Sequence, residues 1–190
     1  EAIDKDSQTP QDLAKMKATH LVVLEMSSFQ LEGTGERGVS PSIAVWTNLL
    51  RDHLNVYPSM HEYAEAKAQI FRHQGPDGMV FLPAKKTFDE YASEAPGKVY
   101  RVGKKEALEH KILTSIPLGM QGEHNQANAE MAAAAALYLG VSPSVIKRVL
   151  KTCKGLPGRQ EEIARIHGVR YIKDTTPTTP DATMAALKTF

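Results

Sequence analysis

The chain has 190 residues, 42% of them hydrophobic and 24% charged, which is the composition of an ordinary soluble globular protein. Its 23 basic and 22 acidic side chains give a formal net charge of +1, so charge offers no reason to expect a nucleic-acid or membrane surface. The single cysteine, Cys153, excludes an internal disulfide and fits a reducing compartment.

Neither a secretory signal nor a membrane-spanning run is visible. The first residues, "EAIDKDSQTP", are polar and acidic where a signal would be basic and then apolar. The longest apolar run, "MAAAAALYLGV", is too short and too rich in alanine to span a bilayer. The chain has no initiator methionine, and we expect it to be a piece of a longer protein.

A helix and then a strand are predicted at the start of the chain. Thr9 and Pro10 predict a short helix that ends near Lys17. The run "THLVVLEMSS", residues 19–28, predicts a strand with Glu25 at its carboxyl end. Because the run is apolar on both faces, it is typical of a parallel sheet covered by helices.

The next three predicted elements form a β-α-β unit. "PSIAVWTN" (41–48) and "DGMVFLP" (77–83) predict two further buried strands, with a helix over residues 59–73 between them. Ser59 and Glu62 have the spacing of a capping box at the start of this helix. The order of elements predicts an α/β fold with a mostly parallel sheet flanked by helices.

The pattern is weaker after the third strand. Short strands are predicted near 98–102 and 111–118. "GEHNQANAEMAAAAALYLG" then predicts a turn and a strongly helical alanine run that ends at Gly140. The following helix, "PSVIKRVLKTC", is expected to be capped by Ser142 and closed by Gly155.

The segment "KGLPGR" is rich in glycine and proline and is our predicted domain boundary. It divides the chain into residues 1–155 and 156–190. Beyond it, "EEIARIHGVRYIKD" predicts a hairpin that turns at His167 and Gly168. A loop and a helix beginning near Pro180 complete the chain.

One lysine lies on the apolar face of the predicted helix 59–73. That face consists of Met60, Tyr63, Ala64, Lys67, Ile70 and Phe71. A lysine in such a place usually packs its stem and keeps its ammonium in water. If the amine is buried instead, it must find an anion or lose its proton. A neutral amine can also add carbon dioxide and become a carbamate, whose oxygens can bind a metal.

Polar residues follow the first two predicted strands at their carboxyl ends, where ligands bind in open α/β sheets. Glu25 ends the first strand, and Asn48, Asp52 and His53 follow the second. A carboxylate and an imidazole at this edge could share a divalent cation. The alternatives are a helix cap or surface ion pair for Glu25 and an ordinary loop histidine for His53.

Five segments resemble, in order and spacing, segments of the Mur ligases. They are "LEMSSFQLEG", "TNLLRDHLNVYPSMHEYAEAKAQIF", "GEHNQAN", "GLPGR" and "KDTTPTTPDAT". The resemblance runs from about Thr19 to the end of the chain. "SSFQLE" is most similar to the D-glutamate-adding, MurD-type branch of the family. Five segments in the correct order are far more specific than a lone glycine-rich loop.

The resemblance implies a cytoplasmic, ATP-dependent ligase of peptidoglycan synthesis that works as a monomer. Such ligases use ATP and Mg²⁺ to phosphorylate the terminal carboxylate of UDP-N-acetylmuramoyl-L-alanine, and the amine of D-glutamate then attacks the acyl phosphate. No nucleic-acid or membrane partner is implied. Little covalent chemistry falls to the protein, so catalysis should rest on positioning and on charge neutralisation by cations.

The resemblance also assigns the residues at the strand ends and the lysine on the helix. Lys67 matches the family's N6-carboxylated lysine, which supports a magnesium ion. Glu25 and His53 match residues grouped around the same ion, so that all three form the expected catalytic and metal site. Magnesium prefers oxygen ligands, so the assignment of His53 depends on the resemblance rather than on coordination chemistry.

Four residues are expected on the nucleotide side. Asn125 and Asn128 match the family's adenine-side contacts, although Asn125 could equally be a plain helix N-cap. Arg159 and Asp174 match residues that reach the nucleotide from the C-terminal domain, with Arg159 contacting phosphate. From the residues alone, either charge would more often lie on an ordinary surface.

The muramoyl-alanine end of the substrate is expected near Ser27 and Gln30, and the substrate site is expected to include Thr176 and Thr178. The second pair is the weaker assignment. Thr176 stands where some MurD-type enzymes have lysine, and Pro177 stands where alanine is usual.

The sequence contains no G-x-x-G-K-[ST] phosphate loop, which in the family lies shortly upstream of where this chain begins. We therefore expect residues 1–155 to be most of the central ATP-binding domain, with a P-loop-type fold but without that loop. Residues 156–190 are expected to begin a Rossmann-like C-terminal domain. The 190-residue chain alone is expected to have no ligase activity.

Three alternatives remain at this point. The nearest is another ligase of the same superfamily, which adds a different amino acid to a muropeptide or glutamate to a folate. A metal-dependent amidohydrolase with a carbamylated lysine would typically have a His-x-His pair, and the seven histidines form none. A non-catalytic nucleotide-binding or interaction module would leave Lys67 merely snorkelling.

Overall fold

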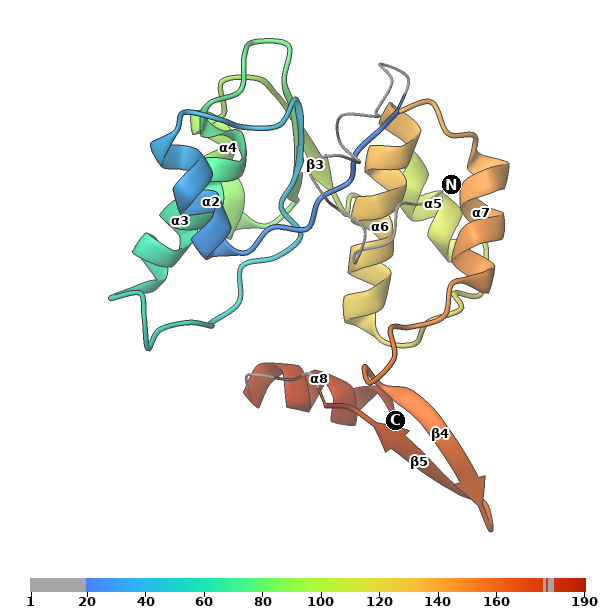
Figure 1. Ribbon diagram of the computed structural model, residues 1–190. Coiled ribbons are helices and arrows are strands. Elements are labelled where there is room, and N and C mark those ends of the chain that lie inside the picture. The colour runs from blue at the N-terminus through green and yellow to red at the C-terminus, as the bar shows by residue number, and fades with distance from the viewer. Residues whose placement is uncertain (1–19, 176, 178–179) are drawn as a thin grey trace.

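The computed structural model describes residues 20–175, 177 and 180–190. Within them, a three-stranded parallel sheet lies at the centre of the larger part of the molecule (Figure 1). Its strands, in spatial order, are β1 (Ile43–Val45), β2 (Met79–Pro83) and β3 (Lys98–Val102). The strands predicted at 41–48, 77–83 and 98–102 are confirmed, whereas the helix predicted from Thr9 to Lys17 lies outside the described residues.

Helices cover both faces of this sheet. On one side are α2 (Ser28–Glu36), α3 (Met60–Arg72), the short 3₁₀ turn η2 (Lys86–Phe88) and α4 (Asp89–Glu94). The alternation of side chains along β2 places Val80 and Leu82 against Phe71 of α3. On the opposite face, Phe81 packs against Met131 of helix α6 (Glu123–Tyr138). The sheet is therefore buried on both faces, as its apolar strands predicted.

The alanine run allows α6 to pack on two sides. Met131 and Ala134 face the sheet, while Ala129 and Ala133 join a second core. That core is shared with α5 (Leu108–Thr114) and α7 (Pro143–Thr152). Alanine permits this because its short side chain lets neighbouring elements approach a helix closely on opposite faces.

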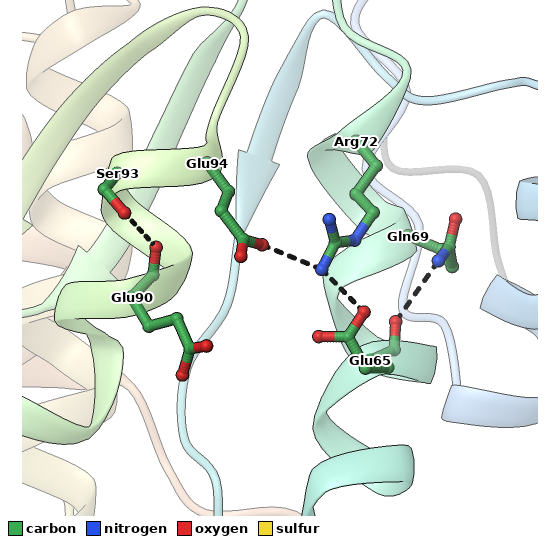
Figure 2. A network of polar contacts seen from close by, with 6 residues as sticks. All are labelled: Glu65, Gln69, Arg72, Glu90, Ser93 and Glu94. Atoms are coloured by element: carbon green, nitrogen blue, oxygen red, sulfur yellow. Dashed lines mark hydrogen bonds and ion pairs between the residues drawn. The ribbon is translucent and has the colours of Figure 1, made fainter.

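A polar network joins α3 to α4 on the outside of the sheet (Figure 2). Arg72 of α3 makes an ion pair with Glu65, two turns earlier on the same helix, at 2.6 Å, and another with Glu94 of α4, at 2.8 Å. Gln69 donates to the carbonyl of Glu65 at 3.3 Å. The Arg72–Glu94 ion pair thus joins two helices that also share the apolar core on this face of the sheet.

The last part of the chain is a hairpin followed by a helix, drawn below the rest of the molecule in Figure 1. Strands β4 (Glu161–Ile166) and β5 (Val169–Lys173) are antiparallel, and α8 (Pro180–Thr189) follows them. His167 and Gly168 form the turn, with φ angles of 49° and 82°. The predicted hairpin and its turn are confirmed.

Two predicted strands are wrong. Residues 20–27 form no regular element, and α2 begins directly after them at Ser28. Among the described residues no strand pairs with this run, so it has no ladder of hydrogen bonds to make it a strand. Residues 108–114 are helical instead of extended, because Ile112 and Leu113 are buried against α6 and α7 as neighbours on one helix. No helix in the described part of the chain is long and apolar enough to cross a membrane.

Candidate active site

Lys67 lies half-buried near the middle of α3. The helix begins as predicted, since the side chain of Ser59 accepts from the backbone N–H groups of His61 and Glu62. The Glu62 carboxylate contacts the Ser59 hydroxyl rather than the backbone of the cap. The predicted capping box is therefore only half formed: Ser59 caps the helix, but Glu62 does not reach back to the backbone of Ser59.

The Lys67 amine lies in a partly desolvated place over an aromatic ring. Its Nζ is 5.0 Å from the centroid of the Tyr63 ring. Burial lowers the pKa of Lys67, while the nearby Asp52 carboxylate acts in the opposite direction. Burial is the larger cause, so the Lys67 amine loses its proton more readily than the amine of an exposed lysine.

Four rings form a closed group beside this amine, which we call the aromatic cluster: Phe29, His53, Tyr57 and Tyr63. Phe29 contacts His53 with ring centroids 5.3 Å apart and Tyr57 at 5.6 Å. Tyr63 contacts His53 at 5.8 Å and Tyr57 at 5.3 Å. The cluster thus joins α2, the loop after β1 and α3, and it places His53 and Lys67 against the same tyrosine.

His53 is fixed by its neighbour as well as by the cluster. Its φ of 55° is in the left-handed region, and its backbone N–H donates to Asp52 Oδ1 at 2.8 Å. Its Nε2 lies 3.7 Å from Asp52 Oδ2. Asp52 therefore acts on both His53 and Lys67, a role that its position in the sequence did not reveal. It also contributes, after burial, to the raised pKa of Tyr63.

Near the start of α2, the residues expected to contact substrate bond to each other, and the expected metal ligand Glu25 is exposed. Ser27 and Gln30 form a complete capping box, in which the Gln30 Oε1 accepts from the Ser27 N–H at 2.8 Å. Glu25 is exposed two residues before this cap. Tyr57 donates to Glu32 of α2 at 3.1 Å, which ties the helix to the loop that carries His53.

No three His, Cys, Asp or Glu side chains converge on a possible metal position in the part of the chain that the structure describes. Glu25, Asp52 and His53 are therefore not arranged as a closed set of three ligands. Lys67 is not a ligand as an amine, but as a carbamate it would add oxygen atoms of the kind that Mg²⁺ prefers.

The residues expected on the nucleotide side, Asn125 and Asn128, lie in the first turns of α6. Gly122, with a φ of 98°, is the N-cap, so Asn125 is not the plain N-cap that the sequence allowed. Instead, the Asn125 Nδ2 donates to the carbonyl of Gln121 at 2.7 Å. Asn128 is exposed one turn later. Both are on the helix predicted to carry them.

Arg159 and Asp174, far apart in the sequence, are brought together by their neighbours. The carbonyl of Gly158 accepts from the Thr175 N–H at 2.9 Å and from its hydroxyl at 3.3 Å. Gly158 is buried with a φ of 75°. Arg159 is exposed, and Asp174 is half-buried. The other expected substrate residues, Thr176 and Thr178, lie outside the described residues.

Two cavities lie in this half of the molecule. One of about 900 Å³ lies between the first turn of α6 and α8, with Glu123, His124 and Lys188 in its lining. The other, of about 460 Å³, is lined by Asp174, Thr175 and Phe190 among others. Lys67 lines neither, so the amine and the cavities are separate features of the surface.

Comparison with known proteins finds a family and several relatives. The sequence pattern of the Mur ligase middle domain matches residues 2–136. The chain is 37% identical, over 207 aligned positions, to UDP-N-acetylmuramoylalanine--D-glutamate ligase of Roseiflexus sp. (strain RS-1), with 95% of this chain and 44% of that protein covered. A protein of the same name from Alkaliphilus oremlandii (strain OhILAs) is 33% identical over 192 positions, with 90% and 41% covered. The chain thus spans about two fifths of these curated relatives.

Solved structures have the same architecture. The chain resembles a crystal structure of MurF from Acinetobacter baumannii, with a TM-score of 0.68 and 26% sequence identity over 84% of this chain and 39% of that one. It also resembles the murein peptide ligase mpl from Psychrobacter arcticus 273-4, with a TM-score of 0.55 and 79% and 35% covered. At 20% identity, this second likeness shows the fold alone.

Proposed function

Since this chain belongs to the Mur ligase family, through the middle domain that matches residues 2–136, we propose that the protein containing it adds D-glutamate to UDP-N-acetylmuramoyl-L-alanine. The observation that carries the proposal is the similarity to the Roseiflexus D-glutamate ligase over 95% of the chain. The protein would act in peptidoglycan synthesis as a cytoplasmic monomer and would take no nucleic-acid or membrane partner.

The proposed reaction has two steps. The terminal carboxylate of the muramoyl-alanine substrate takes the γ-phosphoryl group of ATP, and ADP leaves. The amine of D-glutamate then attacks the acyl carbon, phosphate leaves and the amine loses a proton. Mg²⁺ would neutralise charge on the phosphoryl oxygens when bound. The protein's part is to position the reactants and to hold charges near them.

Lys67, Glu25 and His53 are the proposed catalytic and metal-binding residues. The half-buried amine of Lys67 fits this role, because its lowered pKa favours the neutral form that adds carbon dioxide. The resulting carbamate would supply oxygen to Mg²⁺, and Glu25 would supply a carboxylate. His53 would orient a reacting oxygen from its fixed place in the aromatic cluster.

The nucleotide and the muramoyl substrate would be held by two further sets of residues. Asn125 and Asn128 are proposed to contact the adenine, and Arg159 and Asp174 to reach the nucleotide from the C-terminal domain, Arg159 through the phosphates. The muramoyl-alanine end is proposed near Ser27 and Gln30, and Thr176 and Thr178 would contact the substrate from the C-terminal domain. Because the capping box occupies Ser27 and Gln30, their contacts with substrate would come from atoms that the box leaves available.

Phosphate release from ATP tests the function in the full-length protein. With UDP-N-acetylmuramoyl-L-alanine present, we expect release with D-glutamate and little with L-lysine, meso-diaminopimelate or D-alanyl-D-alanine. Release that depends on a different amino acid, or on a folate acceptor, would assign the protein to another ligase of the superfamily. No amino-acid-dependent release would indicate a binding module.

The role of Lys67 is tested in the same assay. Lys67→Ala should lower kcat/KM by about 100-fold or more, because it removes a preorganised charge beside the transferring group. Short carboxylic acids added to the assay should restore part of the rate. An unchanged rate in Lys67→Ala would mean that the lysine only packs its stem against the helix and takes no part in the reaction.

A further inference from the structure

The loop between α7 and β4 has a left-handed backbone conformation on both sides of Arg159. Gly158 has a φ of 75° and Gln160 a φ of 48°. Glycine adopts this conformation readily, but glutamine does not, and a residue in this region persists only where its surroundings hold it. The conformation of Gln160 therefore calls for a contact that fixes it.

That contact is made with helix α6. Gln160 Nε2 lies 3.2 Å from His124 Nε2, although the two residues are 36 positions apart. The amide donates and the imidazole accepts, which places the ring proton of His124 on Nδ1. The two side chains are half-buried. They join the strained loop to the first turn of α6.

The backbone beside His124 is shaped to admit its ring. A Cβ added at Gly122 would lie 2.6 Å from the His124 Cε1 and 2.9 Å from the Thr189 hydroxyl of α8. Only glycine leaves this space open, and the φ of 98° also favours glycine there. The N-cap of α6 is therefore adapted to this position of the histidine.

Each residue that flanks Arg159 contacts a residue that is adjacent in sequence to another proposed nucleotide-binding residue. Gly158 is held by Thr175, whose neighbour is Asp174. Gln160 is held by His124, whose neighbour is Asn125. Consecutive Cα atoms are only about 3.8 Å apart, so fixing one residue of a pair largely fixes the other.

We propose that His124 and Gln160 are positioning residues that set Arg159 against α6 for nucleotide binding. This inference rests on the proposed function, because Arg159, Asn125 and Asp174 take their nucleotide roles from it. His124 and Gln160 touch no reacting atom. They fix the distance between the part of the site on α6 and the part on the loop before β4.

Nucleotide affinity and steady-state kinetics of the full-length protein test the proposal. The variants are Gln160→Ala, His124→Phe, the double variant and the conservative His124→Gln, whose amide oxygen can accept from Gln160. Gln126→Ala is the matched control, because Gln126 is a half-buried side chain of the same helix turn and lines the same cavity as His124. The probe is adenylyl imidodiphosphate with Mg²⁺, measured by calorimetry.

Gln160→Ala and His124→Phe should each raise the dissociation constant of the probe and the KM for ATP by about three- to tenfold. The double variant should be no weaker than either single variant, because both remove one contact. His124→Gln should lie within about twofold of the unaltered protein. The KM for D-glutamate and the midpoint of thermal unfolding should stay unchanged.

Effects no larger than that of Gln126→Ala, or effects that simply multiply in the double variant, would overturn the positioning role. So would an equal loss in affinity for nucleotide and for D-glutamate, which would indicate general damage. Failure of the proposed function looks different. In that case the unaltered protein binds the probe and the variants still weaken it, but D-glutamate does not stimulate phosphate release.

Discussion

The position of Lys67 on an apolar helix face affects whether its amine is protonated. Burial lowers the pKa of Lys67 below the ordinary lysine value of 10.5, and Asp52 opposes this shift without cancelling it. The neutral amine adds carbon dioxide and releases a proton, so carbamate formation at fixed dissolved carbon dioxide increases as pH rises. The lowered pKa means that Lys67 should react at a lower pH than exposed lysines.

Carbon-13 NMR in labelled bicarbonate measures this reaction directly. At fixed dissolved carbon dioxide, the Lys67 carbamate signal should grow by at least about tenfold per pH unit while the amine is mostly protonated. It should reach half of its final height at a lower pH than the signals of exposed lysines. Lys67→Arg keeps the positive charge but forms no carbamate, and it should remove this signal alone. If the carbamate signal that appears at the lowest pH persists in Lys67→Arg, another lysine is the reactive one.

At the scale of elements, two glycines of α2 differ in what surrounds them. Gly33 has open space where a Cβ would be, whereas a Cβ on Gly35 would lie 2.8 Å from Gln69 Cγ of α3. Gly33 therefore lowers the stability of the helix without any packing benefit. Gly35, in contrast, allows α2 and α3 to approach each other. The approach matters because α2 carries Phe29 of the aromatic cluster.

Alanine at each glycine should therefore have opposite effects on the free energy of unfolding. Gly33→Ala should stabilise the protein by about 0.5 to 1 kcal/mol, because alanine loses less backbone entropy in a helix. Gly35→Ala should destabilise it by about 1 kcal/mol or more, because the Gln69 side chain must move. Urea unfolding measures both. Equal effects of the two substitutions would show that α2 does not pack closely on α3 in solution.

The sequence predicted those elements whose pattern is decided locally. The Ser59 cap and the regular spacing of apolar residues define α3, and the His167 and Gly168 turn defines the hairpin. The segment 111–118 was misassigned, because Ile112 and Leu113 become a helix face only when α6 and α7 are there to cover them. Tertiary packing overrode a weak local preference.

The candidate site was predictable to a similar degree. Lys67 stood out because its charge interrupts an apolar stripe, whereas Asn125, Arg159 and Asp174 were assigned by resemblance and stay predictions. Asp52 was noticed without a role, since only the fold places it near both His53 and Lys67. The contact between His124 and Gln160 gave no signal, because two residues 36 positions apart have no local pattern.

At the scale of the whole molecule, the apolar run Leu21–Leu24 is the feature that departs most from expectation. It reads as a strand buried on both faces, yet Val23 is 83% exposed and Leu24 is 60% exposed. Val80, in the middle strand of the sheet, is fully buried in contrast. The same residue type thus contributes to a core in one place and to an exposed apolar surface in the other.

Substitutions of Val23 and Val80 in the 190-residue chain should differ in their effect on the free energy of unfolding. Val23→Lys should change the free energy of unfolding by less than about 0.5 kcal/mol, because the side chain loses no packing. It should also lower self-association, measured by light scattering, because it places a charge in an exposed apolar run. Val80→Ala should cost about 2 kcal/mol or more, since it leaves a cavity in the core between the sheet and α3. If Val23→Lys instead destabilises the chain as strongly as Val80→Ala, residues 20–27 are packed in solution and the run is a strand after all.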